Sequence, residues 1–302
     1  MKVLIVCSKN SGKIAPFILD QAESLTAQGV EIDFFTVQQK GLFGYLKSRK
    51  GLVQKIKNFQ PDLIHAHYGL SGLLANLQRE IPVVTTYHGS DINKRKIRQF
   101  SKIAILLSKF NIFVSQKNIA IAKPKQNFAL IPCGVDTELF KPMDKIECRT
   151  KFGFTNEEKL VLFSSAFNNQ VKNPQLAKSA VNVLSDIQLV ELKGYSRLQV
   201  CELMNSCDAA LMTSFTEGSP QFIKEAMAVN CPIVSVDVGD VREMIGDTEN
   251  CFICNYSETE IAEALQKVFA TNKRTLGREK ILRLENKIIA GEIIEIYKSI
   301  VR

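Results

Sequence analysis

Short apolar runs alternate with longer amphipathic segments along nearly the whole chain, and this alternation stops once and then starts again. In the first half, strand-like runs occupy residues 2–7, 31–37, 62–66, 82–87, 111–115 and 128–131, with helical patterns near 15–28, 47–59, 69–79 and 94–108. In the second half, strand-like runs occupy 159–164, 187–191, 208–213, 232–236 and 251–254, with helical patterns near 173–184, 197–205, 220–229 and 258–270. Strands that alternate with helices form a mostly parallel sheet covered on both faces. The sequence therefore predicts an α/β protein with two doubly wound parallel-sheet domains.

A turn-rich segment separates the two series. It runs from Pro132-Cys133-Gly134-Val135-Asp136 to Lys141-Pro142 and is typical of a hinge. We place the N-terminal domain at 1–138 and the second domain at 139–284. Doubly wound sheets bind ligands at the carboxyl ends of their strands, so two such domains predict a cleft between them. The polar, glycine-containing loops expected to face this cleft are Ser8 to Lys13, His88 to Asp91, and the loop after Thr213.

The segment from Ser214 to Asn230 contains two glutamates, Glu217 and Glu225, with Gly218-Ser219-Pro220 directly after the first. Ser219 is a good helix N-cap, Pro220 suits a first helical turn, and Asn230 can close the helix, which predicts a helix over 220–229. Its free N–H groups would attract phosphate, and Gly218 would let a ligand approach the backbone. Glu225 would lie about 8 Å along the axis. The alternative is an ordinary helix start with a solvated Glu225.

Composition restricts the class of protein. At 302 residues, 45% hydrophobic and 23% charged, the chain is typical of a soluble globular enzyme. The first apolar run is too short for a signal peptide and no run of 18 apolar residues follows, so we expect a cytoplasmic protein without a membrane span. The eight cysteines are then expected to be reduced. Cys251 and Cys254 fit a buried strand better than a metal or redox pair.

The net charge of +8 is concentrated in the first half. Through residue 140 there are 19 Lys and Arg against 9 Asp and Glu, and the remainder has 20 against 22. Two basic clusters stand out, at 40–57 and 94–102. They are either solvated helix faces or the contact for an anionic partner such as a phospholipid surface, a lipid-linked diphosphate or an acidic glycan. The sequence has no aromatic-rich RNA-binding motif, so we expect no nucleic-acid partner.

Several motifs together resemble a known family. The signature Glu217-Gly218-Ser219-Pro220 with Glu225-Ala226-Met227-Ala228 is followed by Cys231-Pro232-Ile233-Val234 and Asp237-Val238-Gly239. Other agreeing segments are His65 to Gly69, His88 to Asp91, Ile131 to Asp136 with Phe140-Lys141-Pro142, and Val171 to Pro174. In this order they closely resemble the retaining GT-B glycosyltransferases of family four, also called group 1. The combination is specific, although each segment alone is weak.

The resemblance implies two Rossmann-like domains facing across a cleft, with a nucleotide-sugar donor held by the C-terminal domain and an acceptor by the N-terminal one. It implies that the last helix, within 285–302, crosses back onto the first domain. Catalysis in this fold uses no metal and no cofactor, because the nucleotide sugar is itself a substrate. The sequence agrees, since no Asp-x-Asp pair stands beside a strand.

Residue roles follow from the resemblance. The catalytic candidates are His88, Glu217 and Lys172; the donor-binding candidates are Ser11, Gly12, Lys13, Gly218, Ser219, Pro220 and Glu225; and the acceptor-side candidates are Asp91 and His67. Lys172 matches a phosphate-binding lysine, unless it only opens the helix at Pro174. Glu225 matches the glutamate that holds the nucleotide ribose. Asp91 either orients its loop or contacts acceptor or sugar, while His65 and His67 are more simply packed strand-end residues.

One departure concerns the phosphate site. Many relatives carry an arginine before the lysine, but this chain reads Ser164-Ser165-Ala166-Phe167-Asn168-Asn169-Gln170-Val171-Lys172. Asparagine and glutamine can donate hydrogen bonds to phosphate but carry no charge. The hypothesis is that Lys13, in the first loop, partly replaces the missing positive charge.

The resulting prediction is a retaining, metal-independent hexosyltransferase. It would move a sugar from a UDP- or GDP-sugar to a glycan or lipid-linked acceptor in cell-envelope polysaccharide synthesis, in the cytoplasm or on the inner face of the membrane. Two alternatives stay open. One is a nucleotide-sugar epimerase of the same fold, and the other is a non-catalytic, glycan-binding relative.

Overall fold

The computed structural model describes residues 1–10 and 12–301. The chain forms two compact units. The first contains Met1–Gly134 together with the C-terminal segment that starts at Asn286, and the second contains Val135–Glu285. The chain therefore passes from one unit to the other after Gly134 and again after Glu285.

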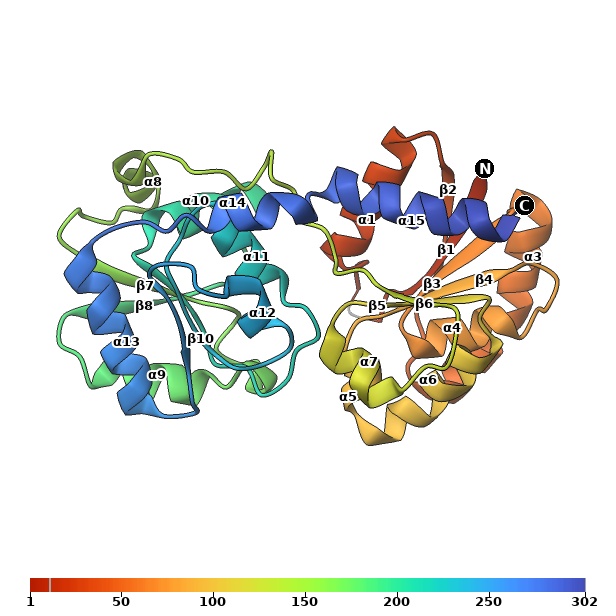
Figure 1. The fold of residues 1–302 in the computed structure, drawn as a ribbon, viewed down its shortest axis with the longest axis horizontal. Coiled ribbons are helices and arrows are strands. Elements are labelled where there is room, and N and C mark those ends of the chain that lie inside the picture. The colour runs from red at the N-terminus through yellow and green to blue at the C-terminus, as the bar shows by residue number, and fades with distance from the viewer. Residues whose placement is uncertain (11, 302) are drawn as a thin grey trace. The chain divides into compact units, whose positions relative to one another are not determined.

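The first unit is built on a parallel sheet of six strands in the order β2-β1-β3-β4-β5-β6 (Figure 1). The strands are β1 (Lys2–Ser8), β2 (Glu31–Val37), β3 (Leu63–His67), β4 (Val83–Tyr87), β5 (Phe110–Phe113) and β6 (Phe128–Leu130). Val3 of β1 lies opposite Ile32 of β2 on one side and Leu63 of β3 on the other. The strand order therefore reverses between β1 and β3, and in sheets of this kind ligands bind at the carboxyl ends beside that point.

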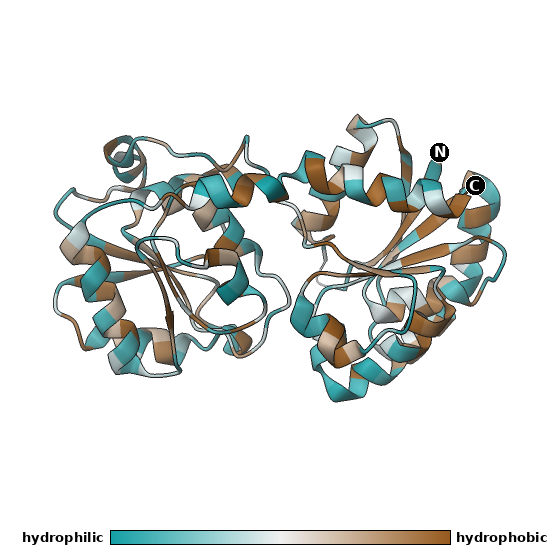
Figure 2. Cartoon of the chain, in the orientation of Figure 1, coloured by the Kyte–Doolittle hydropathy of each residue, from teal (hydrophilic) through white to brown (hydrophobic). Residues whose placement is uncertain are grey.

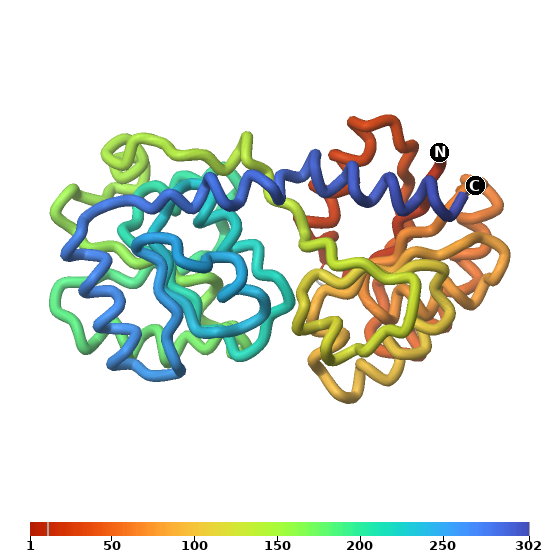
Figure 3. The backbone as a smooth tube through the Cα atoms, in the orientation of Figure 1, coloured from red at the N-terminus to blue at the C-terminus, as the bar shows by residue number. Residues whose placement is uncertain are grey.

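Eight helices belong to this unit in the described part of the chain. They are α1 (Pro16–Ala27), α2 (Gly41–Lys47), α3 (Arg49–Phe59), α4 (Gly69–Asn76), α5 (Ser90–Asn93), α6 (Arg95–Leu107), α7 (Gln116–Ala122) and α15 (Asn286–Val301). The backbone trace shows α15, at the blue end of the chain, lying along α1 near the red end (Figure 3). The contact is closed by Gln28, whose amide donates to the carbonyl of Lys287. The last helix thus completes the N-terminal unit.

The second unit repeats the same plan with five strands in the order β8-β7-β9-β10-β11. The strands are β7 (Lys159–Phe163), β8 (Ile187–Glu191), β9 (Ala209–Met212), β10 (Ile233–Val236) and β11 (Cys251–Cys254). The helices are α8 (Lys145–Phe152), α9 (Pro174–Asn182), α10 (Arg197–Ser206), α11 (Gln221–Ala228), α12 (Val241–Ile245), α13 (Glu258–Thr271) and α14 (Gly277–Ile281), with short 3₁₀ turns at Gln170–Lys172 and Leu282–Leu284. Here the order reverses between β7 and β9.

Most strand residues are apolar because helices cover both faces of each sheet. Val3 to Cys7 in the first sheet and Leu160 to Phe163 in the second are fully buried. Hydropathy colouring shows this contrast, with largely brown strands and helices that carry teal on part of their surface (Figure 2). Polar groups that could meet a ligand are therefore left to the strand ends and the loops that follow.

The expected fold class is confirmed, and all eleven strands lie within two residues of their predicted positions. The sequence missed the short helices α2, α5, α7, α8, α12 and α14. With four to eight residues each, they complete at most about two turns, too few for the 3.6-residue period to stand out.

Candidate active site

Three histidine rings stack in the first unit as a column made of His65, His67 and His88, and His65 lies at its buried end. It lies on β3, a strand buried at every position. Its Nδ1 is 2.5 Å from the hydroxyl oxygen of Tyr297 on α15, and its Nε2 is 2.7 Å from Oγ1 of Thr86. Burial lowers the pKa of His65 to about 3, so the ring is neutral. The interpretation of His65 as a packed strand-end residue is confirmed.

His67 joins this anchor to His88. Its ring stacks on His65 at 4.5 Å between centroids and on His88 at 5.2 Å. Its Nδ1 is 3.0 Å from Nε2 of His88, and one of the two nitrogens donates to the other. Burial, followed by the neighbouring histidines, lowers the pKa of His67 well below its ordinary value.

The structure buries His67, which is one of the acceptor-side candidates. The ring has no exposed surface, because β3 lies inside the sheet. Its Nε2 is among the buried polar atoms of the described chain that lack a hydrogen-bond partner. In the described structure, His67 is buried and contacts His88 through its Nδ1.

His88 follows β4 and is half-buried. Phe17 and Tyr68 flank its ring at 4.8 and 4.7 Å between centroids. Its Nδ1 lies 3.5 Å from the sulfur of Cys133. Aromatic contacts on the ring and partners on both nitrogens fix its orientation.

Asp91 orients the loop that carries His88. One carboxylate oxygen accepts hydrogen bonds from the backbone N–H groups of His88 and Gly89, and the other accepts one from Gly69. Gly89 has φ of 106°, a backbone conformation that favours glycine. Burial raises the pKa of Asp91 to about 6, although these backbone donors lower it. Of the two roles expected for Asp91, the structure gives direct support to loop orientation.

A cavity of about 340 Å³ opens beside these residues at the carboxyl ends of β1 and β3. Its lining includes Asn10, Lys13, Tyr68, Ser90 and Asp91. Gly12 has φ of 88° and no atom within 4 Å of where a side chain would begin. Ser11, also expected at this loop, lies outside the described residues. The cavity offers hydroxyl, amide and ammonium groups, which suit a polar ligand rich in hydroxyls.

In the second unit, Lys172 and Glu217 form an ion pair. Lys172 ends the 3₁₀ turn after β7, and its Nζ is 2.6 Å from Oε1 of Glu217, which follows β9. Their side chains are 23% and 15% exposed, so both can still meet a ligand. The structure thus brings two predicted catalytic residues together beside the point where the strand order reverses.

Hydrogen bonds from the residues that follow β9 hold the turn that carries Lys172 in place. Thr213 donates its hydroxyl to the carbonyls of Lys172 and Asn173, at 3.0 and 2.8 Å. The N–H of Phe215 donates to the carbonyl of Val171. Asn173 takes a left-handed conformation before α9 starts at Pro174. Lys172 does more than open that helix, since its ammonium is turned to Glu217.

Ser219 does not cap α11, which corrects the sequence prediction. Pro220 is the N-cap, without a side-chain cap hydrogen bond, and the helix begins at Gln221. The hydroxyl of Ser219 is instead 2.6 Å from a carboxyl oxygen of Asp240. Pro220 has no N–H to lose, so it tolerates the cap position while Ser219 turns to a stronger acceptor. At the other end, Asn230 has φ of 57° and closes the helix as expected.

Asp240 and Gly239 hold the Glu217 loop from the other side. Gly239 has φ of 59°, and a side chain there would begin 2.6 Å from the carbonyl oxygen of Gly218. Burial raises the pKa of Asp240 to about 6, with the charge of Lys224 acting against it. Sequence reasoning missed Asp240, because a single acidic residue after a strand gives no signal of its own.

Glu225 lies on α11 with its Oε1 3.7 Å from a guanidinium nitrogen of Arg197. The side chains are 12% and 33% exposed, and Arg197 also covers the ring of Phe140 at 5.2 Å. The solvated alternative for Glu225 is therefore wrong. Sequence reasoning missed Arg197, and it also missed Phe215, a 61% exposed ring that stacks on Tyr256.

Two models of known families match this chain. The model described as Glycosyltransferase Family 4 matches residues 14–139, and that described as Glycosyl transferases group 1 matches residues 158–271. The chain belongs to the group 1 glycosyltransferases. The Lys172 turn, the Glu217 loop and α11 all lie within the second match.

Individual proteins are similar to this chain in sequence or in structure. TuaC of Bacillus subtilis (strain 168), a glycosyltransferase assigned to teichuronic acid biosynthesis, is 25% identical over 247 residues, which cover 70% of this chain and 62% of TuaC. The sucrose-phosphate synthase (tll1590) structure from Thermosynechococcus elongatus has a TM-score of 0.85 at 16% identity and 99% coverage of both chains. Anabaena Alr3699/HepE, solved with UDP, has a TM-score of 0.80 at 17% identity and covers 99% of this chain and 100% of its own. These structures share the GT-B fold.

The described residues contain neither a cluster of metal-ligating side chains nor a membrane-spanning helix. Across residues 1–10 and 12–301, no three or more His, Cys, Asp or Glu side chains are grouped as metal ligands. In the same residues, no helix has the length and apolar character needed to cross a membrane. The cysteines are free thiols within this range, and six of the eight are buried.

Proposed function

We propose that this group 1 glycosyltransferase moves a sugar from a UDP- or GDP-linked donor to a hydroxyl of a glycan or lipid-linked acceptor, with retention of configuration and without a metal. The observation that carries the proposal is the Lys172–Glu217 pair at the carboxyl ends of β7 and β9 in the second unit. A nucleotide sugar has a diphosphate beside a hydroxyl-rich ring. A lysine beside a carboxylate provides a partner for each.

Lys172 would stabilise the leaving nucleoside diphosphate. In the transfer, the acceptor oxygen bonds to the anomeric carbon, the bond from that carbon to the phosphate oxygen breaks, and the acceptor proton passes to the leaving phosphate. Negative charge develops on the diphosphate, and a fixed ammonium stabilises it more in the transition state than in the ground state. Glu217 holds this ammonium 2.6 Å away, ready for the donor.

Retention of configuration is consistent with the side chains of the candidate site. If the leaving phosphate takes the proton from an acceptor on the same face, no side chain has to act as a strong base. The histidines of the first unit include two whose pKa values are lowered by burial, so those two rings stay neutral at physiological pH. Neutral rings that position His88 against a polar substrate fit this proposal better than a general-base relay does.

Glu225 and the Glu217 loop would hold the rest of the donor. A carboxylate suits two neighbouring ribose hydroxyls, and Glu225 keeps 12% of its side chain exposed beside Arg197. Gly218 and Ser219 would offer backbone N–H groups to sugar or phosphate. Arg197 brings a permanent positive charge to this unit, which lacks the arginine expected before Lys172. HepE, of the same fold, is also solved with UDP-glucose, which supports starting with a uridine donor.

On the acceptor side, the cavity beside Asp91 would receive the hydroxyl-bearing substrate. Its lining by Ser90 and two tyrosines, Tyr45 and Tyr68, suits a sugar ring, because aromatic faces pack on its C–H groups while polar groups meet its hydroxyls. The biosynthetic role named for TuaC supports a cell-envelope polysaccharide as the product.

The proposal is tested by thermal shift with UDP, GDP, ADP, CMP and their common sugar conjugates. A ligand that binds only the folded chain raises its melting temperature by mass action. We expect a shift with one nucleotide and its sugar, which Glu225→Ala abolishes. Glu263→Ala, on the exposed face of α13, is the matched control and should leave the shift unchanged.

Two results would count against transfer. A shift with no nucleotide would favour a non-catalytic relative. Conversion of the bound nucleotide sugar into its epimer in the absence of any acceptor would favour the epimerase alternative.

A further inference from the structure

Two aromatic rings of the second unit, Phe215 and Tyr256, are exposed and take no part in the donor contacts proposed above. Phe215 follows β9 and is 61% exposed, and Tyr256 follows β11 and is 49% exposed. Their planes lie 17° apart with 5.9 Å between the ring centroids, so the rings stack with an offset. Apolar surface left in water forgoes the stabilisation that burial gives, so two such rings side by side favour a ligand-binding surface.

Hydrogen bonds to the backbone hold both rings at the candidate site. The hydroxyl of Tyr256 donates to the carbonyl of Ser214 at 2.7 Å. The N–H of Phe215 donates at 3.0 Å to the carbonyl of Val171, the residue before Lys172. The rings are therefore fixed to the loops that follow β7 and β9, which also carry the Lys172 ion pair. A surface that is already ordered loses little conformational freedom when a ligand binds.

Two carboxylates lie near the hydroxyl of Tyr256. Burial, followed by the charges of Asp237 and Glu217, raises the pKa of Tyr256. Both carboxylates are partly exposed, and each forms an ion pair, Asp237 with Arg242 and Glu217 with Lys172. A carboxylate oxygen accepts more than one hydrogen bond, so these groups can bind hydroxyls while the ion pairs persist. Aromatic faces beside hydroxyl acceptors suit a sugar ring, whose C–H groups pack on the aromatic face.

The strand order indicates how a donor would extend across this unit. The two edge strands of the sheet are β8 and β11. Arg197, the partner of Glu225, follows β8, and Lys172 follows β7. A nucleotide sugar with its ribose at Glu225 and its diphosphate at Lys172 would have its base toward β8 and its sugar toward β9. The aromatic rings, which follow β9 and β11, lie on the sugar side.

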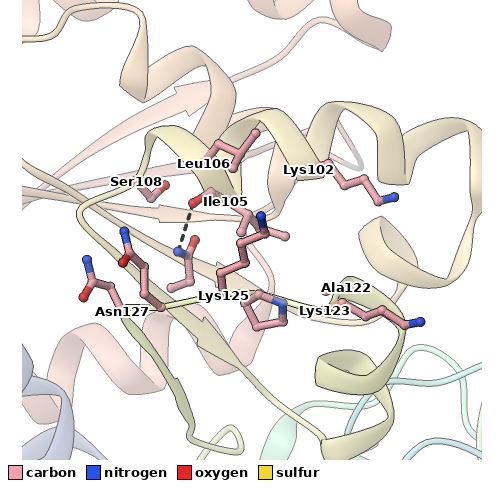
Figure 4. Close-up of a pocket in the computed structure, with 11 residues that line it drawn as sticks. Lys102, Ile105, Leu106, Ser108, Ala122, Lys123, Lys125 and Asn127 are labelled. Carbon is pink, nitrogen blue, oxygen red and sulfur yellow. Dashed lines mark hydrogen bonds between the residues drawn. The ribbon is translucent and has the colours of Figure 1, made fainter.

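A cavity of about 440 Å³ in the first unit, between α6 and the loop that follows α7, lacks this combination of groups (Figure 4). Within the described chain, its lining contains no aromatic ring and no carboxylate. The side chains of Lys102, Lys123 and Lys125 do not converge on one point, and the hydrogen bond drawn there joins the amide of Asn111 to the carbonyl of Ile105. The aromatic pair of the second unit is the feature with a chemically defined ligand.

We propose that Phe215 and Tyr256 form an aromatic platform on which a pyranose ring of the substrate stacks, with its hydroxyls toward Glu217 and Asp237. This inference rests on the proposed transfer and adds a site that holds a sugar. The ring belongs either to the donor or to the acceptor glycan, since the same chemistry recognises both. A nucleobase also stacks on aromatic rings, but it would lie toward β8.

Thermal shift measurements with a nucleotide and with its sugar conjugate test the donor as the source of the ring. The nucleotide alone reports on the proposed donor site, and the conjugate adds the sugar. Phe215→Leu keeps an apolar side chain but removes the flat face. It should weaken binding of the conjugate about tenfold and leave binding of the nucleotide unchanged. Phe43→Leu, at a 79% exposed phenylalanine on α2 of the first unit, is the matched control and should change neither.

Saturation-transfer difference NMR tests the acceptor as the source. The probes are the methyl glycosides of glucose, galactose, mannose and N-acetylglucosamine, measured with and without the nucleotide and with the saturating nucleotide sugar. Ring C–H signals that persist beside the nucleotide sugar belong to the acceptor. Phe215→Leu should weaken them about tenfold, whereas Phe43→Leu should not. In either arm, Phe215→Tyr, which keeps a flat ring, should stay within about threefold of the original protein.

The aromatic platform is wrong if Phe215→Leu weakens sugar binding in neither arm, or if Phe43→Leu weakens it equally. Loss of the shift with the nucleotide alone in Phe215→Leu would make the rings a base-stacking surface. Self-association in sedimentation velocity that Phe215→Leu abolishes would make them an interface between copies of the chain. Both results overturn the proposal. A shift with no nucleotide counts against the proposed transfer instead, and the glycoside spectra recorded without nucleotide then decide the platform by themselves. Melting temperatures verify that the variants fold, as expected for exposed positions.

Discussion

The polar residues at the strand ends of the first unit are mostly buried and neutral, whereas those of the second unit are charged and partly exposed. His65 and His67 have no exposed surface, and burial lowers the pKa of both. Lys172 and Glu217 are 23% and 15% exposed and face each other as an ion pair. The two sheets have the same strand order up to the fifth strand, so the difference lies in the loops and not in the scaffold.

This contrast indicates how one scaffold can hold two kinds of substrate. A buried column of neutral rings places no charge inside the unit and fixes the angle of His88. A partly exposed ion pair costs little desolvation, and its lysine can exchange the carboxylate for a diphosphate. Under the proposed function, the first arrangement would position a neutral, hydroxyl-bearing substrate, and the second would recognise an anionic one.

The largest effect is expected from removing the charge in the second unit. Lys172→Ala should lower kcat/KM for transfer by about 10³-fold, as the loss of a fixed donor to a developing negative charge does. Lys178→Ala, on α9 of the same unit with its ammonium over the ring of Phe167, is the control and should leave turnover unchanged. A loss below about tenfold for Lys172→Ala would make the Lys172–Glu217 pair part of the scaffold only.

A large effect on stability is expected from Asp91 in the first unit. Asp91→Ala leaves three backbone N–H groups without their acceptor in a buried place, which should cost about 3 kcal/mol of unfolding free energy. Urea unfolding measures this loss. Asp62→Ala removes an exposed carboxylate from the N–H of Lys2 and should cost less than about 1 kcal/mol. If Asp91→Ala and Asp62→Ala lower the unfolding free energy equally, the buried hydrogen bonds of Asp91 do not stabilise the unit more than an exposed one does.

The positions of Lys172 and Glu217 near each other could be predicted from the sequence. Lys172 and Glu217 are 45 residues apart, yet each follows a recognisable strand, and parallel strands bring their carboxyl ends to the same edge. The resemblance to the family then predicts roles for them. For this reason the strands, the helix α11 and the charged pair could all be placed before the fold was known.

The partners of these residues could not be placed. Asp240, Arg197 and Tyr297 make side-chain contacts that depend on loop geometry and on packing. Loop geometry and packing leave no periodic pattern in the sequence. Ser219 illustrates this limit of prediction from the sequence. Its type and position predict an N-cap, but Asp240 lies within reach as a stronger acceptor, and tertiary context decides.

A smaller effect tests whether the histidine column serves the acceptor side alone. His88→Ala should lower turnover about 10²-fold and leave the nucleotide thermal shift unchanged, because Lys172, the Glu217 loop and Glu225, which are proposed to hold the donor, belong to the second unit. Cys133→Ser, which keeps a hydroxyl near Nδ1 of His88, is the control and should cost less than about threefold. If His88→Ala removes the nucleotide shift as well, the division of labour between the two units is wrong.

The smallest effect concerns the pH dependence of stability, which should arise largely from the first unit because the second has no histidine. The folded pKa of His65 is about 3 and that of His67 is well below its ordinary value, so the unfolded chain binds their protons first as pH falls through about 6.5. Between pH 7.5 and 6.0 this should cost about 0.8 kcal/mol for each ring.

Asp91 and Asp240 act in the opposite direction. Burial raises the folded pKa of each to about 6, so the folded chain holds protons that the unfolded chain has lost, and each adds about 0.4 kcal/mol at pH 6.0 relative to pH 7.5. The protein should therefore lose about 0.8 kcal/mol over this range, whereas the variant H65Q/H67Q, without the two rings, should gain about that amount. Urea unfolding at the two pH values compares the slopes and not the absolute stabilities, so a general loss in the variant does not affect the result. If the sign of the slope is the same in both proteins, the neutral histidine column is not what distinguishes the first unit from the second.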